Sequence, residues 1–376
     1  MITYIFLFLF FCCLSLTDYI YITPVYKWIL TMVGVLVTFL VLWGFASLRW
    51  KTGTDWDSYY DTFFYFSDEY RNYFEPGFIV IVSTIRSLTS NYSIFLLVFS
   101  FLCLSLKYVF FYKFNREIIF TLIFLFYCYY FGDIFAVRQN LAISITLLST
   151  WFIIKRQPYL FVIIVLLASS IHFTSILYLI AYYLYWTKIS NKTFLVLILV
   201  SIVFGFVGGG GLILEFLLKV FGVGGYVGEK ITQYVTGEGV AINTNNDPIL
   251  IYTLGLIKRC LLIPIFMYVK VKSKDDYPYL KGFFNLYMVG NLIYFLFAKD
   301  MAIFARMSVP FLFFEIFLLA YFIKFSTSIS KKGMLFAFLI VLILAVSRFN
   351  ALVNSYYDLY VPYNSIFDRR IDRSLE

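Results

Sequence analysis

Charge is scarce in this sequence. Aspartate, glutamate, lysine and arginine make up 14% of its 376 residues, whereas hydrophobic residues make up 62% and the mean hydropathy is +0.86. Soluble globular domains carry about 25% charged residues. The composition therefore excludes a soluble enzyme and predicts an all-α polytopic membrane protein.

Motifs for nucleotide and metal chemistry are missing as well. No GxxxxGK[ST] phosphate loop, HExxH, GxSxG or zinc-type spacing occurs. The five cysteines all lie in apolar runs, and we expect them to be free, buried thiols. The basic residues form no stripe, so the net charge of +9 does not indicate a nucleic-acid partner. We expect no metal and no cofactor.

Long apolar runs, by contrast, are abundant. Since about 20 residues cross the hydrocarbon core, the runs predict about twelve spans in a single bundle over residues 1–376. The expected spans are 2–22, 25–47, 93–112, 117–134, 137–154, 158–171, 173–186, 193–213, 249–269, 282–298, 302–323 and 333–349. The segment 76–90 is too short to span and contains Arg86, so we interpret it as a re-entrant or interfacial helix.

Lysine and arginine recur in the short connections, and neighbouring basic clusters are separated by two spans. The positive-inside rule places these clusters in the cytoplasm. The aromatic and acidic loop 48–92, the Gly/Thr/Asn-rich loop 214–248 and the tail 350–376 then face outward. Arg138 and His172 fall on that same outward side, so the unusual polar residues are expected to gather there.

The outward stretch "GTDWDSYY" alternates carboxylates with aromatic rings. Gly53 allows a tight turn, after which Asp55 and Asp57 precede Tyr59. Carboxylates accept hydrogen bonds from sugar hydroxyls, and ring faces cover the C–H face of a sugar. The stretch predicts a sugar-binding surface; the alternative is an interfacial aromatic belt with solvated charges.

Arg138 and Gln139 begin the apolar stretch "RQNLAISITLL". A helix N-terminus already favours anions, and a guanidinium there makes a strong anion site. The alternative is an arginine that reaches to the interface or pairs with Asp133.

His172 is the one histidine of the chain. It is either a neutral, hydrogen-bonded side chain or a general base, because imidazole has a pKa suited to proton transfer near neutrality. Lys258 and Arg259 lie inside an expected span, and Arg306 follows a short outward turn. A cation at the bilayer centre costs roughly 2.5–3.5 kcal/mol, so these residues indicate an anionic ligand or a hydrated cavity.

Four motifs in order, "GTDWDSYY", "EPGF", "RQNLA" and "LASSIHFTSILYL", resemble the EpsG/Wzy-type polysaccharide polymerases over residues 45–190. The resemblance implies a membrane glycosyltransferase of the bacterial inner membrane with its active site facing the outside. Its substrate would be an oligosaccharide repeat unit linked to undecaprenyl diphosphate, for O-antigen, capsule or exopolysaccharide. The fold would resemble the lipid-linked glycosyltransferase (GT-C-like) superfamily, with membrane lipid and a chain-length regulator as partners.

The same resemblance suggests roles for the unusual residues. His172 is the expected catalytic base, with Asp55 or Asp57 as the alternative. Positioned arginines would neutralise the diphosphate leaving group in place of a metal, although Asp55 and Asp57 could together hold Mg²⁺. The residues expected to bind substrate are Arg49, Asp57, Tyr59, Glu75, Arg138, Gln139, Lys258, Arg259 and Arg306.

Three other functions use similar parts. An O-antigen ligase would transfer the chain from the same lipid to a different acceptor, and a membrane acyltransferase would also use a lone histidine. A transporter or flippase of lipid-linked sugar suits the intramembrane cations. However, the sequence has no motif repeat between its halves and no pair of Pro/Gly-broken helices, which argues against a transporter.

Overall fold

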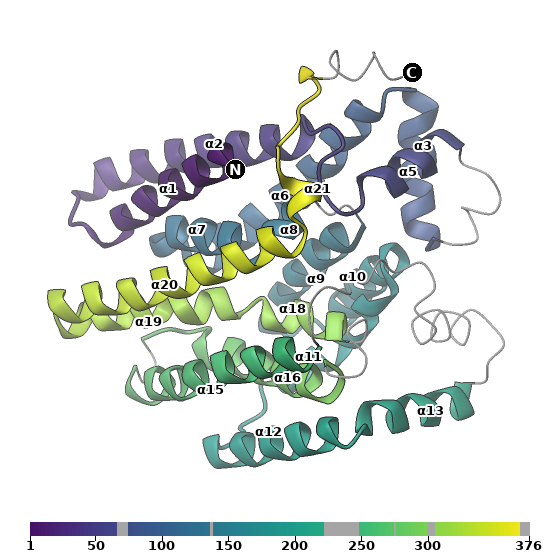
Figure 1. Cartoon of the computed structure of the whole chain (residues 1–376). Helices are drawn as coiled ribbons and strands as arrows, with labels where there is room; N and C mark the ends of the chain where they lie inside the picture. Colours follow the sequence, from purple (N-terminus) through teal and green to yellow (C-terminus); the bar gives the residue numbers. More distant parts are fainter. Residues whose placement is uncertain (66–73, 136–137, 222–247, 274–275, 299–304, 369–376) are drawn as a thin grey trace. The chain divides into compact units, whose positions relative to one another are not determined.

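A computed structural model describes residues 1–65, 74–135, 138–221, 248–273, 276–298 and 305–368 (Figure 1). Over these ranges the chain is helical, with one isolated β-bridge between Arg49 and Ser365. The chain forms two compact units, and the expected single bundle stays a prediction. Unit 1 is Met1–Leu179 with Ile323–Glu376, and unit 2 is Ile180–Phe322.

Unit 1 carries the first half of the chain and its last helices. Helix α1 packs against α7, α2 against α6, and α9 against both α6 and α10. The elements are α1 (Ile2–Leu16), η1 (Thr17–Tyr19), α2 (Pro24–Ser47), α3 (Trp56–Tyr65), α5 (Pro76–Leu88), α6 (Tyr92–Asn115), η2 (Arg116–Ile118), α7 (Ile119–Tyr129), α8 (Phe131–Phe135), α9 (Arg138–Ile154), α10 (Pro158–Ile171), η3 (Phe173–Ile180), α20 (Lys331–Ser355) and α21 (Tyr357–Tyr360).

Unit 2 is built around α16, which packs against α12, α15 and α18. Its elements are α11 (Ala181–Leu184), α12 (Asn191–Phe206), α13 (Gly209–Phe221), α15 (Pro248–Lys272), α16 (Leu280–Phe297), η4 (Arg306–Ser308), α18 (Val309–Leu312) and α19 (Glu315–Ile329), whose last residues belong to unit 1. An added Cβ at Gly205 would lie 2.1 Å from the carbonyl oxygen of Phe295, so glycine permits the close approach of α12 to α16.

Six helical segments of the described chain are long and apolar enough to cross a membrane. They are Ile2–Tyr19, Pro24–Ser47, Tyr92–Tyr129, Leu280–Phe297, Arg306–Ile329 and Lys331–Ser355. The protein is therefore an all-helical, polytopic membrane protein, while the count of about twelve spans stays a prediction. The expected span 193–213 is interrupted at Gly208 (φ +81°), and the expected span 173–186 is a 3-10 helix followed by one short turn. The short helix expected at 76–90 is α5.

Helix starts follow ordinary capping rules. Proline opens α2, α5, α10 and α15, since its missing N–H has no partner in the first turn of a helix. Asn91, Ser190 and Ser330 cap α6, α12 and α20 through their side-chain oxygens at 2.9–3.1 Å.

Lysines of the short connections make contacts within their own unit, while their cytoplasmic placement stays a prediction. In unit 1, Lys113 and Lys155 both lie over the ring of Trp151, and Lys324 pairs with Glu117. In unit 2, the Nζ of Lys270 donates to Asn191 at 3.2 Å.

The tail, the loop after α2 and the start of α1 meet at one place in unit 1. The hydroxyl of Tyr4 donates to the carbonyl of Tyr360. Backbone hydrogen bonds of 2.8 Å join Trp50 to Asn364, Gly53 to Leu359 and Ile366 to Leu48.

Candidate functional site

Glu75 is the centre of a buried ionic cluster in unit 1. Its Oε2 lies 2.5 Å from Nη1 of Arg138, and its Oε1 lies 3.7 Å from Nδ1 of His172. The same Oε1 accepts a 3.1 Å hydrogen bond from the backbone N–H of Phe173. The fold thus brings together three of the residues that the sequence singled out, from three separate motifs.

The motif "EPGF" explains how Glu75 reaches this position. Pro76 opens α5. Glu75 is the N-cap residue of this helix, and its carbonyl accepts a hydrogen bond from the N–H of Ile79. A Cβ at Gly77 would lie 2.3 Å from Oγ of Ser170 and 2.7 Å from its carbonyl oxygen. Only glycine therefore lets α5 meet α10 two residues before His172.

Arg138 opens α9, as the sequence predicts. Its guanidinium lies 4.8 Å above the ring of Phe74, and its backbone is hydrogen-bonded to the Tyr59 hydroxyl. Burial raises the pKa of Tyr59 above its ordinary value, and Asp55 raises it further, so Tyr59 stays a neutral hydroxyl. The carboxylate that pairs with Arg138 is Glu75.

His172 occupies the junction between α10 and η3. Its backbone is extended, its N–H donates to Ala168 at 2.9 Å, and its carbonyl accepts from Ser175 at 3.1 Å. Because Nδ1 is turned toward Glu75, Nε2 points away from the carboxylate on the opposite edge of the ring.

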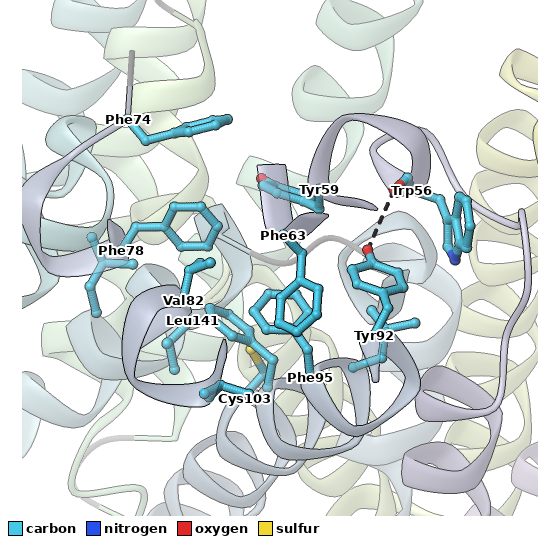
Figure 2. Close-up of a cluster of buried hydrophobic side chains, with 14 of the residues drawn as sticks. Trp56, Tyr59, Phe63, Phe74, Phe78, Val82, Tyr92, Phe95, Cys103 and Leu141 are labelled. Atoms are coloured by element: carbon cyan, nitrogen blue, oxygen red, sulfur yellow. Dashed lines mark hydrogen bonds between the residues drawn. The ribbon is translucent and has the colours of Figure 1, made fainter. Parts of the chain in front are cut away.

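Several aromatic residues of the loop after α2 are core residues. Figure 2 shows Trp56, Tyr59 and Phe63 of α3 packed with Phe78 of α5 and Phe95 of α6. The Tyr92 hydroxyl donates to the carbonyl of Trp56 at 3.4 Å within this cluster. The ring of Tyr59 is thus buried and does not form an open stacking face, because α3 must cover the aromatic surface of α5 and α6.

Arg49 is almost wholly buried at the end of α2. Its Nη1 donates to the carbonyl of Thr52 at 3.4 Å, and its guanidinium lies 5.5 Å from the ring of Phe135. Gly53 has φ +106°, and a Cβ there would meet Nη1 of Arg49 at 2.8 Å, which confirms the predicted glycine turn. Burial lowers the pKa of Arg49, while Asp55 and the neighbouring tyrosines raise it.

The two loop carboxylates differ in exposure. Asp55 is half-buried before α3, whereas Asp57 is exposed in its first turn. Among the described residues, no three His, Cys, Asp or Glu side chains come together as a metal site. The expectation of no metal, and the Mg²⁺ alternative at this pair, both stay predictions.

The remaining predicted cations belong to unit 2. Lys258 pairs with Glu315 at 2.6 Å. Arg259 donates to the carbonyl of Gly255 at 3.1 Å and lies 3.6 Å from the ring centre of Tyr294. Arg306 is exposed in η4, and in unit 1 Gln139 is half-buried beside Arg138. Substrate binding by all of these residues stays a prediction.

Sequence reasoning missed Lys107. This lysine is fully buried in α6, and its Nζ donates to the side chain of Asn140 and to Oγ of Ser144, the latter at 2.6 Å. It therefore holds the first turn of α9, which begins with Arg138. The signal was a lone lysine inside the apolar run "FLCLSLKYVFF".

Comparison with known proteins adds one finding. The model of the EpsG family matches residues 32–365, a range that contains Arg49, Glu75, Arg138 and His172. No curated protein and no solved structure matches the chain. Because the match covers most of the chain, the protein belongs to the EpsG family, a family of Wzy-type polysaccharide polymerases.

Proposed function

We propose that this protein polymerises oligosaccharide repeat units carried on undecaprenyl diphosphate, on the outer face of the bacterial cytoplasmic membrane. The observation that carries the proposal is the cluster of Glu75, Arg138 and His172. It holds a cation suited to a diphosphate beside an imidazole suited to a hydroxyl proton. Family membership supports a glycosyltransferase-type polymerase.

The proposed reaction needs one base and one cation. The acceptor hydroxyl loses its proton to Nε2 of His172, and its oxygen attacks the anomeric carbon of the donor sugar. The bond from that carbon to the diphosphate oxygen breaks, and the electron pair stays on the diphosphate. Arg138 meets this growing negative charge, so the leaving group needs neither an acid nor a metal.

Two features of the cluster support these roles. Arg138 adds its guanidinium to the N-terminus of α9, where the helix dipole already favours an anion. His172 has Nδ1 turned toward a carboxylate, which leaves Nε2 to act as the base. Asp55, half-buried in the loop before α3, is the alternative base.

The other predicted residues of unit 1 divide by burial. Asp57 is exposed and Gln139 is half-buried, and both carry polar groups that can bind sugar hydroxyls. Arg49, Tyr59 and Glu75 are buried, which favours a role in positioning their neighbours.

The test is extension of a defined substrate by purified protein. Wild type and His172→Gln are placed in lipid nanodiscs with one undecaprenyl-diphosphate-linked repeat unit, and the products are separated on a gel. Wild type is expected to give a ladder of longer products and free undecaprenyl diphosphate, whereas His172→Gln gives neither.

Three results would contradict the proposal. Transfer of the sugar only to lipid A core would identify a ligase. Movement of intact substrate across a vesicle membrane, with no longer product, would identify a transporter. Transfer of an acyl group in place of a glycosyl group would identify an acyltransferase.

A further inference from the structure

Glu75 faces Arg138 and His172 but makes a close ion pair only with Arg138. It lies 2.5 Å from Arg138, whereas its distance to Nδ1 of His172, 3.7 Å, is too long for a hydrogen bond. We propose that donor binding activates the base through Glu75. The diphosphate takes Arg138 away from Glu75, and the released carboxylate then accepts a hydrogen bond from Nδ1 of His172. This inference rests on the proposed function.

Access to the cluster favours this order of events. The side chain of Glu75 is 1% exposed and that of His172 is 9% exposed, whereas Arg138 retains 17%. An entering anion therefore meets Arg138 first. Arg138 can turn toward this anion while its guanidinium remains over the ring of Phe74.

Glu75 cannot follow Arg138. Its backbone caps α5, and Gly77 lets that helix pack tightly against Ser170. The N–H of Phe173 also donates a hydrogen bond of 3.1 Å to Oε1. The carboxylate is thus anchored next to His172, and a small rotation brings it within hydrogen-bond range of Nδ1.

The electrostatic consequence follows from the charges that face the imidazole. Among the described residues these include Glu75, from the start of α5, and Arg138, from α9; Tyr59 lies within electrostatic range of both, and Asp55 lies within electrostatic range of Tyr59. While Arg138 is paired with Glu75, it neutralises the negative charge of this carboxylate. When the diphosphate draws Arg138 away, Glu75 stabilises the imidazolium, so His172 becomes a stronger base at the moment when a donor is present.

The single histidine makes the experiment specific. With ¹³C- and ¹⁵N-labelled histidine, every imidazole NMR signal of the purified protein comes from His172. Titrations are recorded for wild type and Glu75→Gln, each with and without undecaprenyl diphosphate that carries no sugar. Glutamine keeps the size of the side chain and an acceptor for the N–H of Phe173, but it removes the charge.

Undecaprenyl diphosphate is expected to raise the pKa of His172 in wild type by about one, the usual effect of an opposite charge at short range. It is also expected to shift the ring to the form with the proton on Nδ1. In Glu75→Gln only the direct effect of the diphosphate charge remains, so the rise is at most half as large. Equal rises in both proteins would overturn the inference.

A second readout protects the test if Glu75→Gln does not fold. In wild type alone, the Nδ1 proton should move downfield when undecaprenyl diphosphate binds, because it enters a hydrogen bond to a carboxylate. An unchanged Nδ1 signal in a wild-type protein that still polymerises overturns this inference and leaves the proposed function standing. A wild type that neither binds undecaprenyl diphosphate nor polymerises overturns both.

Discussion

The ionic clusters of the two units are built differently. In unit 1, Glu75 lies at the start of α5, Arg138 at the start of α9 and His172 at the end of α10. Three helix ends therefore meet at the carboxylate of Glu75. In unit 2, Lys258 and Arg259 lie in the interior of α15, and their partners are Glu315 at the first residue of α19 and the ring of Tyr294 in α16.

The unit 1 cluster is suited to ligand binding and proton transfer, whereas the unit 2 cluster is suited to stabilising the packing of its helices. Helix ends leave backbone N–H and C=O groups without helical partners, and these groups can hold a carboxylate or a ligand in place. Most backbone groups in a helix interior are already paired, so a charge there depends largely on side chains from the neighbouring helices, although Arg259 also donates to the carbonyl of Gly255. Substitutions in the unit 1 cluster are therefore expected to change turnover, whereas substitutions in the unit 2 pair are expected to change stability.

Replacement of His172 by alanine is expected to lower the single-turnover rate by roughly 10²–10⁴-fold, the usual contribution of a general base. Affinity for undecaprenyl diphosphate should stay close to that of wild type, because Arg138 is intact. The rate and the affinity are measured on the same preparation. Near-normal turnover would move the base to Asp55, and Asp55→Asn would then be the inactive variant.

Arg138→Ala is expected to weaken binding of the lipid diphosphate and to slow turnover by roughly 10²–10³-fold, since the charge that Arg138 meets grows as the bond breaks. Arg138→Lys should restore only part of the activity, because an ammonium lacks the planar fork of a guanidinium. Normal binding and turnover of Arg138→Ala would make Arg138 an interfacial anchor.

Gly77→Ala tests whether the geometry of the site depends on the α5–α10 contact. The new methyl group would lie within 3.0 Å of both the hydroxyl and the backbone of Ser170, so α5 and α10 must move apart, Glu75 shifts with α5, and turnover falls by roughly 10-fold. The matched control is Gly44→Ala in α2, where an added Cβ has no atom within 4 Å. Equal activities of the two variants would show that the contact is not required.

Glu315→Ala tests the unit 2 pair through stability. Removing this buried carboxylate leaves Lys258 without its counter-charge, which lowers the free energy of unfolding by about 3 kcal/mol, the low end of the range because Lys258 is 25% exposed. Unfolding in detergent measures the loss, and a combined Lys258→Met and Glu315→Leu variant should recover most of it. A loss of turnover at unchanged stability would instead place Glu315 in the chemistry.

Chelation has the smallest expected effect. Because Arg138 supplies the charge that meets the diphosphate, polymerisation should proceed at an unchanged rate in EDTA. Loss of activity in EDTA, with recovery on adding Mg²⁺, would reassign Asp55 and Asp57 as metal ligands.

The sequence predicted helix positions well where local chemistry decides them. Proline and Asn/Ser caps set the starts of α2, α6, α10 and α20, and the apolar runs set their lengths. The division into two units was not predicted, because a hydropathy pattern records how apolar a segment is and not which other segment it contacts. The broken span at Gly208 shows the same limit, since its backbone turn interrupts an otherwise continuous apolar run.

The residues of the site were predicted, but their relationships were not. Arg138 and His172 stood out because a cation and a lone histidine are unusual in an apolar chain. That Glu75 joins them depends on the contact of Gly77 with Ser170, which lies 93 residues further along the chain and has no local signal. Likewise, Tyr59 looked like an exposed sugar platform because alternating aromatic residues read the same whether they cover a ligand or a neighbouring helix.

The contact between the tail and the loop after α2 has a consequence for biosynthesis. Trp50 and Gly53 are made early, but their partners Asn364 and Leu359 are made only after all of unit 2. At synthesis rates of about 5–20 residues per second, the early half of unit 1 waits on the order of tens of seconds for its closing segment. During that interval the buried surroundings of Arg49 lack Tyr360 and Tyr363, so this end of unit 1 reaches its final form only after unit 2 has been made.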